Sequence, residues 1–148
     1  MKTILEKLFQ TSPIPTIDVA LLIFRVFAGI ALLRGHGIEK LFNFSEELAH
    51  IPDPFGIGAT PSLLFALFAD FFCAILIILG AFTRLAAIPI FTTTLIGFLV
   101  VHGGDAWQLR DVPFIYSVVF IAIFLFGAGK YSIDAWIARK FNLHQLEQ

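Results

Sequence analysis

Four long apolar runs constrain the fold of this sequence more than any other feature. They cover about residues 17–33, 61–81, 85–101 and 112–128, each near the ~20 residues that a helix needs to cross ~30 Å of hydrocarbon. Lipid offers backbone N–H and C=O groups no partner, so a chain inside it pairs them within helices. A soluble helical protein is the alternative, but four such runs leave no polar faces to meet water. The sequence therefore predicts an all-α membrane protein, a bundle of four transmembrane helices.

Two short amphipathic segments flank these runs. Residues 2–10 and 133–141 each place apolar side chains along one side of a helix and basic side chains elsewhere, a pattern typical of helices that lie among the lipid headgroups. We also expect the first span to continue as a helix toward residue 42. No repeat or low-complexity tract divides the chain, so residues 1–148 are predicted to form a single membrane domain.

The distribution of Lys and Arg predicts an orientation. With four spans, both termini and the loop at Arg84 share one side of the membrane. That side carries six basic residues, Lys2, Lys7, Arg84, Lys130, Arg139 and Lys140, and the other carries three, Arg34, Lys40 and Arg110. Because basic residues are enriched in cytoplasmic loops, we expect both termini in the cytoplasm and the two longer loops outside.

Composition also argues against several functions. Apolar residues make up 58% of the sequence and the net charge is −1, which argues against a nucleic-acid partner, since such partners are bound by basic surfaces. Cys73 is the only cysteine, so neither an intramolecular disulfide nor a CxxC redox pair can form. Any electron transfer would need a cofactor or another subunit.

Two charged residues interrupt the apolar runs. Arg25 lies near the middle of the first run and Asp70 near the middle of the second. A charge at the centre of a span costs ~2.5–3.5 kcal/mol on insertion scales, so it normally faces the bundle and has a partner. We therefore predict an ion pair between Arg25 and Asp70. The pair could fix the packing of the helices or contribute to a ligand site.

A polar seam continues from this pair toward the outer surface. Counting 100° per residue places His36 on the same face of the first helix as Arg25, and Lys40 joins that face if the helix continues. His102 comes at the outer end of the third run. The predicted substrate-binding residues are therefore Arg25, His36, Lys40, Asp70 and His102. No metal site is predicted, because the spacing of the histidines matches no ligand signature.

Four motifs, taken in order along the chain, resemble the DoxX family of small four-helix bacterial membrane proteins. The stretch His36-Gly37-Ile38-Glu39-Lys40 is similar to the HGxxK of the family. Residues 53–58 (Asp-Pro-Phe-Gly-Ile-Gly), residues 79–87, similar to LGxxTRxAA, and residues 127–134, similar to GPGxYSLD, follow in the family's order. The resemblance covers roughly residues 18–137. The chain departs from it at Asp70, where the family usually has Glu, and at Ala128, where it has Pro.

The resemblance implies a place in the inner membrane of a bacterium and a link to membrane redox chemistry. The family is named after a subunit associated with thiosulfate–quinone oxidoreductase. The resemblance therefore implies a subunit of a quinone-linked redox system that binds a quinone at the polar seam. It also implies that the chain assembles with partner subunits or with further copies of itself. A non-catalytic accessory or assembly subunit is the alternative, and a small-solute carrier is a third. The residues assign no catalytic group, so the sequence does not decide whether the protein is an enzyme.

Overall fold

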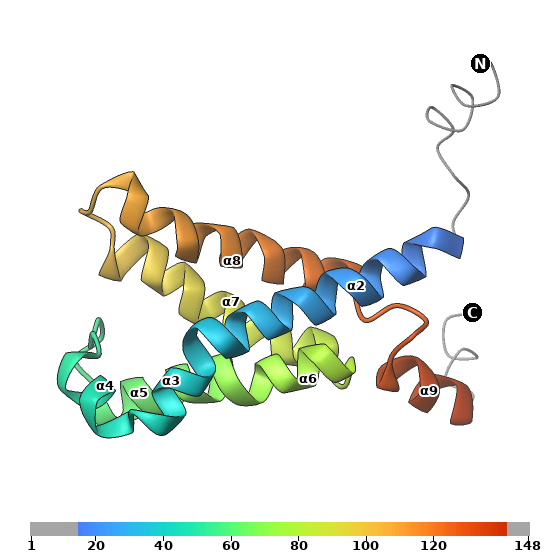
Figure 1. Cartoon of the computed structure of the whole chain (residues 1–148), viewed down its shortest axis with the longest axis horizontal. Coiled ribbons are helices and arrows are strands. Elements are labelled where there is room, and N and C mark those ends of the chain that lie inside the picture. The colour runs from blue at the N-terminus through green and yellow to red at the C-terminus, as the bar shows by residue number, and fades with distance from the viewer. Residues whose placement is uncertain (1–14, 142–148) are drawn as a thin grey trace, which may run out of the picture.

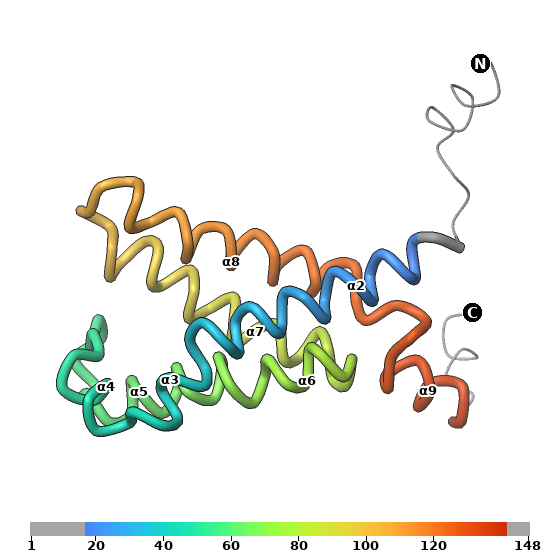
Figure 2. Tube along the Cα trace, in the orientation of Figure 1, coloured from blue at the N-terminus to red at the C-terminus, as the bar shows by residue number. Residues whose placement is uncertain are grey.

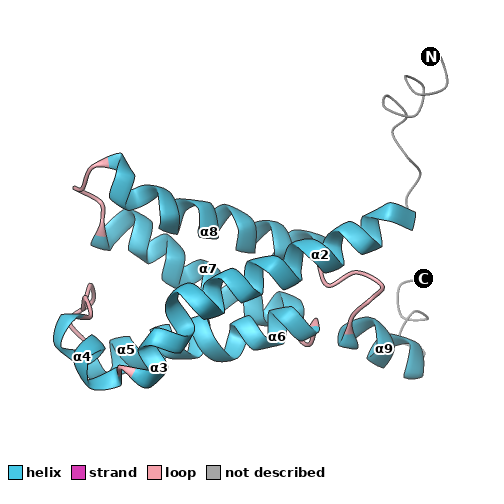
Figure 3. Cartoon of the chain, in the orientation of Figure 1, coloured by secondary structure: helices cyan, strands magenta, loops and turns pink. Residues whose placement is uncertain are grey.

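The computed structural model describes residues 15–141, and these residues form helices joined by short turns, with no strand among them (Figures 1 and 3). The elements in order are α2 (Pro15–Leu32), η1 (Leu33–Gly37), α3 (Ile38–Phe42), α4 (Phe44–His50), α5 (Ala59–Leu67), η2 (Phe68–Cys73), α6 (Ala74–Leu79), α7 (Thr83–Ile96), η3 (Gly97–Val101), α8 (Trp107–Phe126) and α9 (Ile133–Lys140). The segments labelled η are π-helical; η1 and η2 each connect two α-helices without a break, whereas η3 extends the end of α7. The all-α prediction is confirmed for this part of the chain.

Three continuous helices are long and apolar enough to cross a membrane. They are Ala59–Leu79, Thr83–Val101 and Trp107–Phe126. They correspond to the second, third and fourth predicted spans. The helix that begins with α2 runs beside them and continues through η1 and α3 to residue 42, as predicted (Figure 2). The predicted helix at residues 2–10 lies outside the described residues.

Most ends of the three helices differ from the predicted boundaries by two residues, and the start of the fourth span differs by five. The second span ends at Leu79 and not at residue 81, because Gly80 adopts a left-handed conformation (φ +68°) that stops the helix. That conformation is open to glycine at little steric cost. The fourth span begins at Trp107, ahead of the predicted residue 112. The prediction began the span after the charged residues Arg110 and Asp111, but both lie within the first turns of α8.

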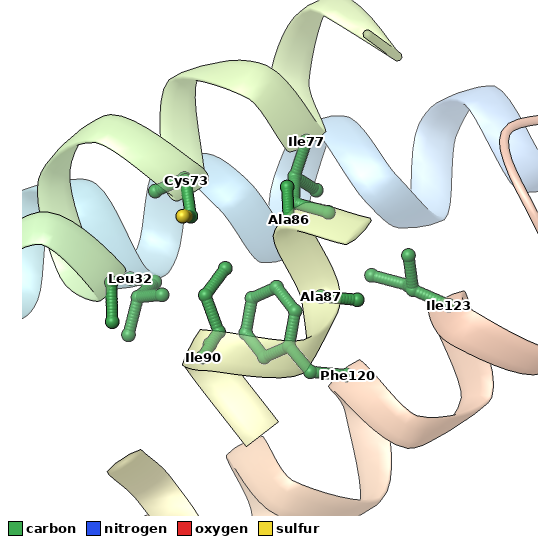
Figure 4. Packing of buried hydrophobic residues seen from close by; sticks show 10 residues of the cluster. Leu32, Cys73, Ile77, Ala86, Ala87, Ile90, Phe120 and Ile123 are labelled. Carbon is green, nitrogen blue, oxygen red and sulfur yellow. The ribbon is translucent and has the colours of Figure 1, made fainter. Parts of the chain in front are cut away.

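The core lies between the long helices and is built mainly from small and branched aliphatic side chains around Phe120. It consists of Leu32, Ala69, Cys73, Ala74, Ile77, Ala86, Ala87, Ile90, Phe120 and Ile123. Figure 4 shows Phe120 of α8 projecting toward Ile90 and Ala87 of α7. Alanines on α6 and α7 let the neighbouring helices pack closely. Many large apolar side chains on the outside are exposed, such as Phe27 at 68% and Leu85 at 66%, which suits contact with lipid.

Arg25 lies in a cluster of hydrogen bonds at the end of the bundle where α6 ends. Its guanidinium donates to the carbonyl oxygens of Ile77 (3.0 Å) and Ile78 (2.5 Å) and also to that of Tyr131. A cation there satisfies carbonyls that a helix terminus leaves unpaired and offsets the negative end of the helix dipole. The hydrogen bonds of Arg25 thereby join α2, the end of α6 and the turn that precedes α9.

Helix α9 completes this end of the molecule. The Ser132 hydroxyl accepts a hydrogen bond from the N–H of Ala135 (3.1 Å) and so caps the helix. The Asp134 carboxylate accepts from the N–H groups of Phe82 (2.6 Å) and Thr83 (2.8 Å), at the start of α7. A helix is thus present at the second predicted amphipathic segment. Its position at the membrane surface stays a prediction.

Candidate functional site

The three π-helical segments surround one cavity at the other end of the bundle. Segment η1 contributes His36, η2 contributes Asp70, and η3 contributes Gly97 and Val101. A π-helical turn inserts an extra residue into a helix, and such turns occur frequently at functional sites. Three helices that depart from α geometry around the same space therefore mark this cavity as the candidate functional site.

The cavity has a volume of about 300 Å³ and walls that are mostly apolar. Residues of the loop after α4, such as Pro54 and Ile57, line it together with Phe65, Val101 and Val112. The polar residues of the wall are His36, Lys40, Ser62, Asp70, Thr93, Thr94, His102 and Tyr116. An apolar pocket with a few polar groups is the usual form of a small-molecule site.

An ion pair between Lys40 and Asp70 is the principal polar feature of the wall. The Nζ of Lys40 lies 3.0 Å from Oδ2 of Asp70, and the two side chains are only 13% and 7% exposed. Each charge therefore needs the other, because an unpaired buried charge is strongly unfavourable. The pair joins α3 to η2.

Gly37 allows this pair to form. A Cβ added at Gly37 would lie 2.8 Å from the carbonyl carbon of Asp70 and still closer to its oxygen. Only glycine lets the two backbones approach this closely. The close approach places His36 and Lys40, which flank Gly37 on η1 and α3, beside Asp70.

The predicted ion pair between Arg25 and Asp70 is wrong. The prediction matched two residues in the middle of their apolar runs, but the close approaches at Gly37 and Gly29 set a different register between the two helices. Gly37 lies opposite Asp70, and Gly29 lies opposite Ala74 and Ile78 of α6. Arg25 therefore reaches only the end of α6, where it binds backbone carbonyls. Arg25 is not among the described residues that line the cavity.

The other four predicted site residues meet at the cavity. His36 packs its ring edge-on against Tyr116, with 5.7 Å between ring centroids. His102 lies at the end of η3, and its Nδ1 is 2.7 Å from Oδ2 of Asp105. Both side chains of this second pair are about two-fifths exposed, so His102 stands at a solvent-accessible edge.

Sequence reasoning missed the polar groups of the third and fourth spans. The Thr93 hydroxyl is buried and has no hydrogen-bond partner among the described residues. The Ser117 hydroxyl donates to Thr94 (3.1 Å) and thereby links α7 to α8. The run of three threonines at residues 92–94 in an otherwise apolar segment is the signal that could have identified this wall, together with Tyr116.

The loop over the cavity is held by Asp53. Its carboxylate accepts hydrogen bonds from the N–H groups of Gly58 (2.8 Å) and Ile57 (3.0 Å) and from the Ser62 hydroxyl (3.1 Å). The bond from the Gly58 N–H is the main cause that lowers the pKa of Asp53 below its ordinary value. The ionised carboxylate therefore fixes the loop, of which Pro54 and Ile57 line the cavity.

Among residues 15–141, no three His, Cys, Asp or Glu side chains gather closely enough to hold a metal ion. What the cavity offers instead is hydrogen bonding. Lys40, Thr93 and Tyr116 can donate, and His36 can donate or accept according to its tautomer. The arrangement suits a ligand with an apolar body and a head that carries hydrogen-bond acceptors.

Comparison with known proteins agrees with the motifs. The DoxX family model matches residues 20–103, more than half of the sequence. The chain belongs to the DoxX family. It is also 27% identical over 132 residues to an uncharacterized protein of Haemophilus influenzae (strain ATCC 51907 / DSM 11121 / KW20 / Rd), over 83% of this chain and 86% of the relative. No solved structure matches. This is therefore a DoxX-family membrane protein, and its relative brings no assigned reaction.

The family motifs lie at opposite ends of the helix bundle. The HGxxK stretch supplies the cavity wall with His36 and Lys40 and the close approach with Gly37. The motifs at residues 79–87 and 127–134 meet at the opposite end, where Asp134 caps α7. One set of motif residues thus surrounds the cavity, and the other fixes the bundle.

Proposed function

We propose that this protein binds the headgroup of a lipophilic quinone as a subunit of a quinone-linked redox system. The observation that carries the proposal is the buried Lys40–Asp70 ion pair in the wall of an otherwise apolar cavity. A charged pair adds little to the stability of a fold compared with apolar side chains of similar size. A role in binding explains why charges lie there.

The chemistry of the wall matches a quinone headgroup. A quinone presents carbonyl oxygens at opposite edges of a flat apolar ring, and both oxygens accept hydrogen bonds. The Lys40 ammonium supplies a donor, and so does the Thr93 hydroxyl, which has no partner within residues 15–141. The His36–Tyr116 contact supplies aromatic surface. The volume, about 300 Å³, is at the lower end of the ~300–1,000 Å³ range of ligand pockets, which fits a headgroup whose tail remains in lipid.

The proposal divides the redox chemistry between subunits. Reduction of a quinone to a quinol takes up two electrons and two protons. A redox-active partner subunit would supply the electrons. This chain would hold the headgroup and pass protons from water at the His102 edge, through His36, to the quinone oxygens. Cys73, which lies in the core and is 1% exposed, takes no part.

The proposed topology has α2 as a fourth span and both termini on the cytoplasmic side of the inner membrane. The distribution of Lys and Arg supports the orientation. In that orientation the cavity, with the loop at residues 51–58 and His102 around it, lies toward the outer half of the membrane. Helix α9 would lie at the cytoplasmic surface, with Trp136 (55% exposed) toward lipid.

Direct binding tests the proposal. We expect the protein, purified in detergent, to bind decyl-ubiquinone at least about tenfold more tightly than decylbenzene, which has a ring but no carbonyl oxygens. Thr93→Val should weaken the binding of the quinone alone. Thr92→Val is the matched control, because the Thr92 hydroxyl bonds to Ile88 of its own helix. Equal affinity for the two ligands would contradict a headgroup site.

Complementation separates this proposal from an accessory role. His36→Ala removes a wall residue that forms no ion pair within the cavity and should leave the fold intact. We expect the variant to accumulate normally in the membrane and to fail to complement a deletion strain. Full complementation would instead support the non-catalytic accessory subunit.

A further inference from the structure

A second hollow lies at the end of the bundle where α7 begins and α8 ends, away from the cavity. It is a groove of about 570 Å³, formed by the first turn of α7, the residues that follow α8 and the first turns of α9. Two of the candidate spans, Thr83–Val101 and Trp107–Phe126, have their ends here. With both helices placed across the bilayer, the groove lies where the hydrocarbon gives way to headgroups.

An unpartnered hydroxyl lies inside this groove. Thr83 lines the groove and is only 1% exposed, and its Oγ1 has no hydrogen-bond partner among the described residues. A buried hydroxyl without a partner is unfavourable, by about 1–3 kcal/mol in mutational series. The geometry thus leaves a hydrogen bond open to a group that enters the groove.

The Arg84 side chain supplies a cation to the same groove. Arg84 is exposed, and its guanidinium lies against Gly127, where an added Cβ would be 3.4 Å from Nε and 3.5 Å from the nearer terminal nitrogen. In the first turn of the 14-residue α7, the N–H groups of Arg84 and Leu85 have no carbonyl within the helix to bond. A guanidinium and a helix N-terminus together favour a phosphate.

The surrounding charges favour an anion despite Asp134, which also lines the groove. The carboxylate of Asp134 already accepts from the N–H groups of Phe82 and Thr83. The Arg25 guanidinium, which donates to the carbonyl oxygen of Tyr131, supplies a positive charge at the same end of the bundle. Lys130, Arg139 and Lys140 add positive charge at this end and Asp18 adds one negative charge, so among the described residues basic groups outnumber acidic ones there.

We propose that this groove binds the phosphate of an anionic phospholipid, with Arg84 and the Thr83 hydroxyl as its ligands. Apolar side chains beside them complete the site. Phe82, Leu85 and Phe126 line the groove and are 62%, 66% and 67% exposed, so they can contact the acyl chains. The net positive charge selects a lipid with a net charge of −1, such as phosphatidylglycerol, over a zwitterionic one.

Thermal unfolding in defined lipid tests this site. Purified full-length protein in detergent is titrated with phosphatidylglycerol or, separately, with phosphatidylcholine, and the midpoint of unfolding is recorded. A ligand that binds the native state raises this midpoint as its concentration increases. We expect phosphatidylglycerol to raise it and phosphatidylcholine to have little effect. In Arg84→Gln the apparent affinity for phosphatidylglycerol should fall by about 10- to 100-fold.

Thr83→Val gives the sharper result. It removes the unpartnered hydroxyl, so without lipid the variant should be at least as stable as the wild type. With phosphatidylglycerol its apparent affinity should fall by about tenfold. The matched control is Thr92→Val on the same helix, which should respond to lipid as the wild type does. An equal response from Thr83→Val and Thr92→Val, or an equal effect of both lipids on the wild type, would overturn the proposal.

Discussion

Replacing Asp70 with leucine should leave the ammonium group of Lys40 buried without a partner. The Lys40 side chain is 13% exposed, and its ion pair with Asp70 spans 3.0 Å, so loss of the carboxylate leaves the ammonium largely desolvated. Removing one member of a buried pair costs about 3–5 kcal/mol, whereas replacing both members by apolar residues is often neutral. We therefore expect Asp70→Leu to unfold readily and Asp70→Leu with Lys40→Met to recover most of the lost stability.

Equilibrium unfolding of the purified variants in detergent, followed by circular dichroism, measures this double-mutant cycle. Asp105→Leu is the matched control, because it breaks the solvent-exposed pair with His102 and should cost less than ~1 kcal/mol. If Asp70→Leu proves as stable as the wild type, or if the double variant loses the sum of the two single losses, Lys40 and Asp70 do not depend on each other.

Three further predictions concern the framework around the cavity. Gly37→Ala should cost about 1–3 kcal/mol in thermal unfolding by forcing two backbones apart, whereas Gly35→Ala should be tolerated, since the nearest atom is 3.9 Å from its Cβ position. Bonds from the Gly58 N–H and its neighbours lower the pKa of Asp53, so this carboxylate stabilises the fold above its ordinary pKa and ceases to do so as the pH falls through the lowered value. The difference in melting temperature between wild type and Asp53→Asn should vanish on acidification, and a constant difference would contradict this. A cysteine at Glu46, in a cysteine-free background, should react with an impermeant reagent in intact cells, and protection there with reactive termini would reverse the proposed orientation.

The helices could be predicted from the sequence because the bilayer imposes a simple rule. A long apolar run has one way to pair its backbone in lipid, and the three candidate spans lie where the runs occur. Boundaries were harder to predict, since they depend on single residues. Gly80 stops a helix through a positive φ, whereas Arg110 and Asp111 sit within a helix that they were expected to precede.

The site could be predicted in part. His36, Lys40, Asp70 and His102 do line one cavity, because charged and polar side chains in apolar runs avoid lipid and turn inward. The partner of Asp70 was missed, since pairing depends on how two helices slide against each other. Glycines set that register, with Gly37 against Asp70 and Gly29 against Ala74. A helical wheel of constant 100° steps also cannot represent the π-helical turns of η1 and η2.

The quinone content of the purified protein tests the central claim most directly. Protein extracted from native membranes in mild detergent is analysed by mass spectrometry for quinone bound per chain. The wild type is compared with the double variant Lys40→Met and Asp70→Leu, in which the fold should be retained while the charges of the cavity wall are removed. We predict quinone on the wild type and its loss from the double variant at equal helix content. Equal quinone on both proteins, or none on the wild type, would contradict the assignment of the cavity as a quinone site.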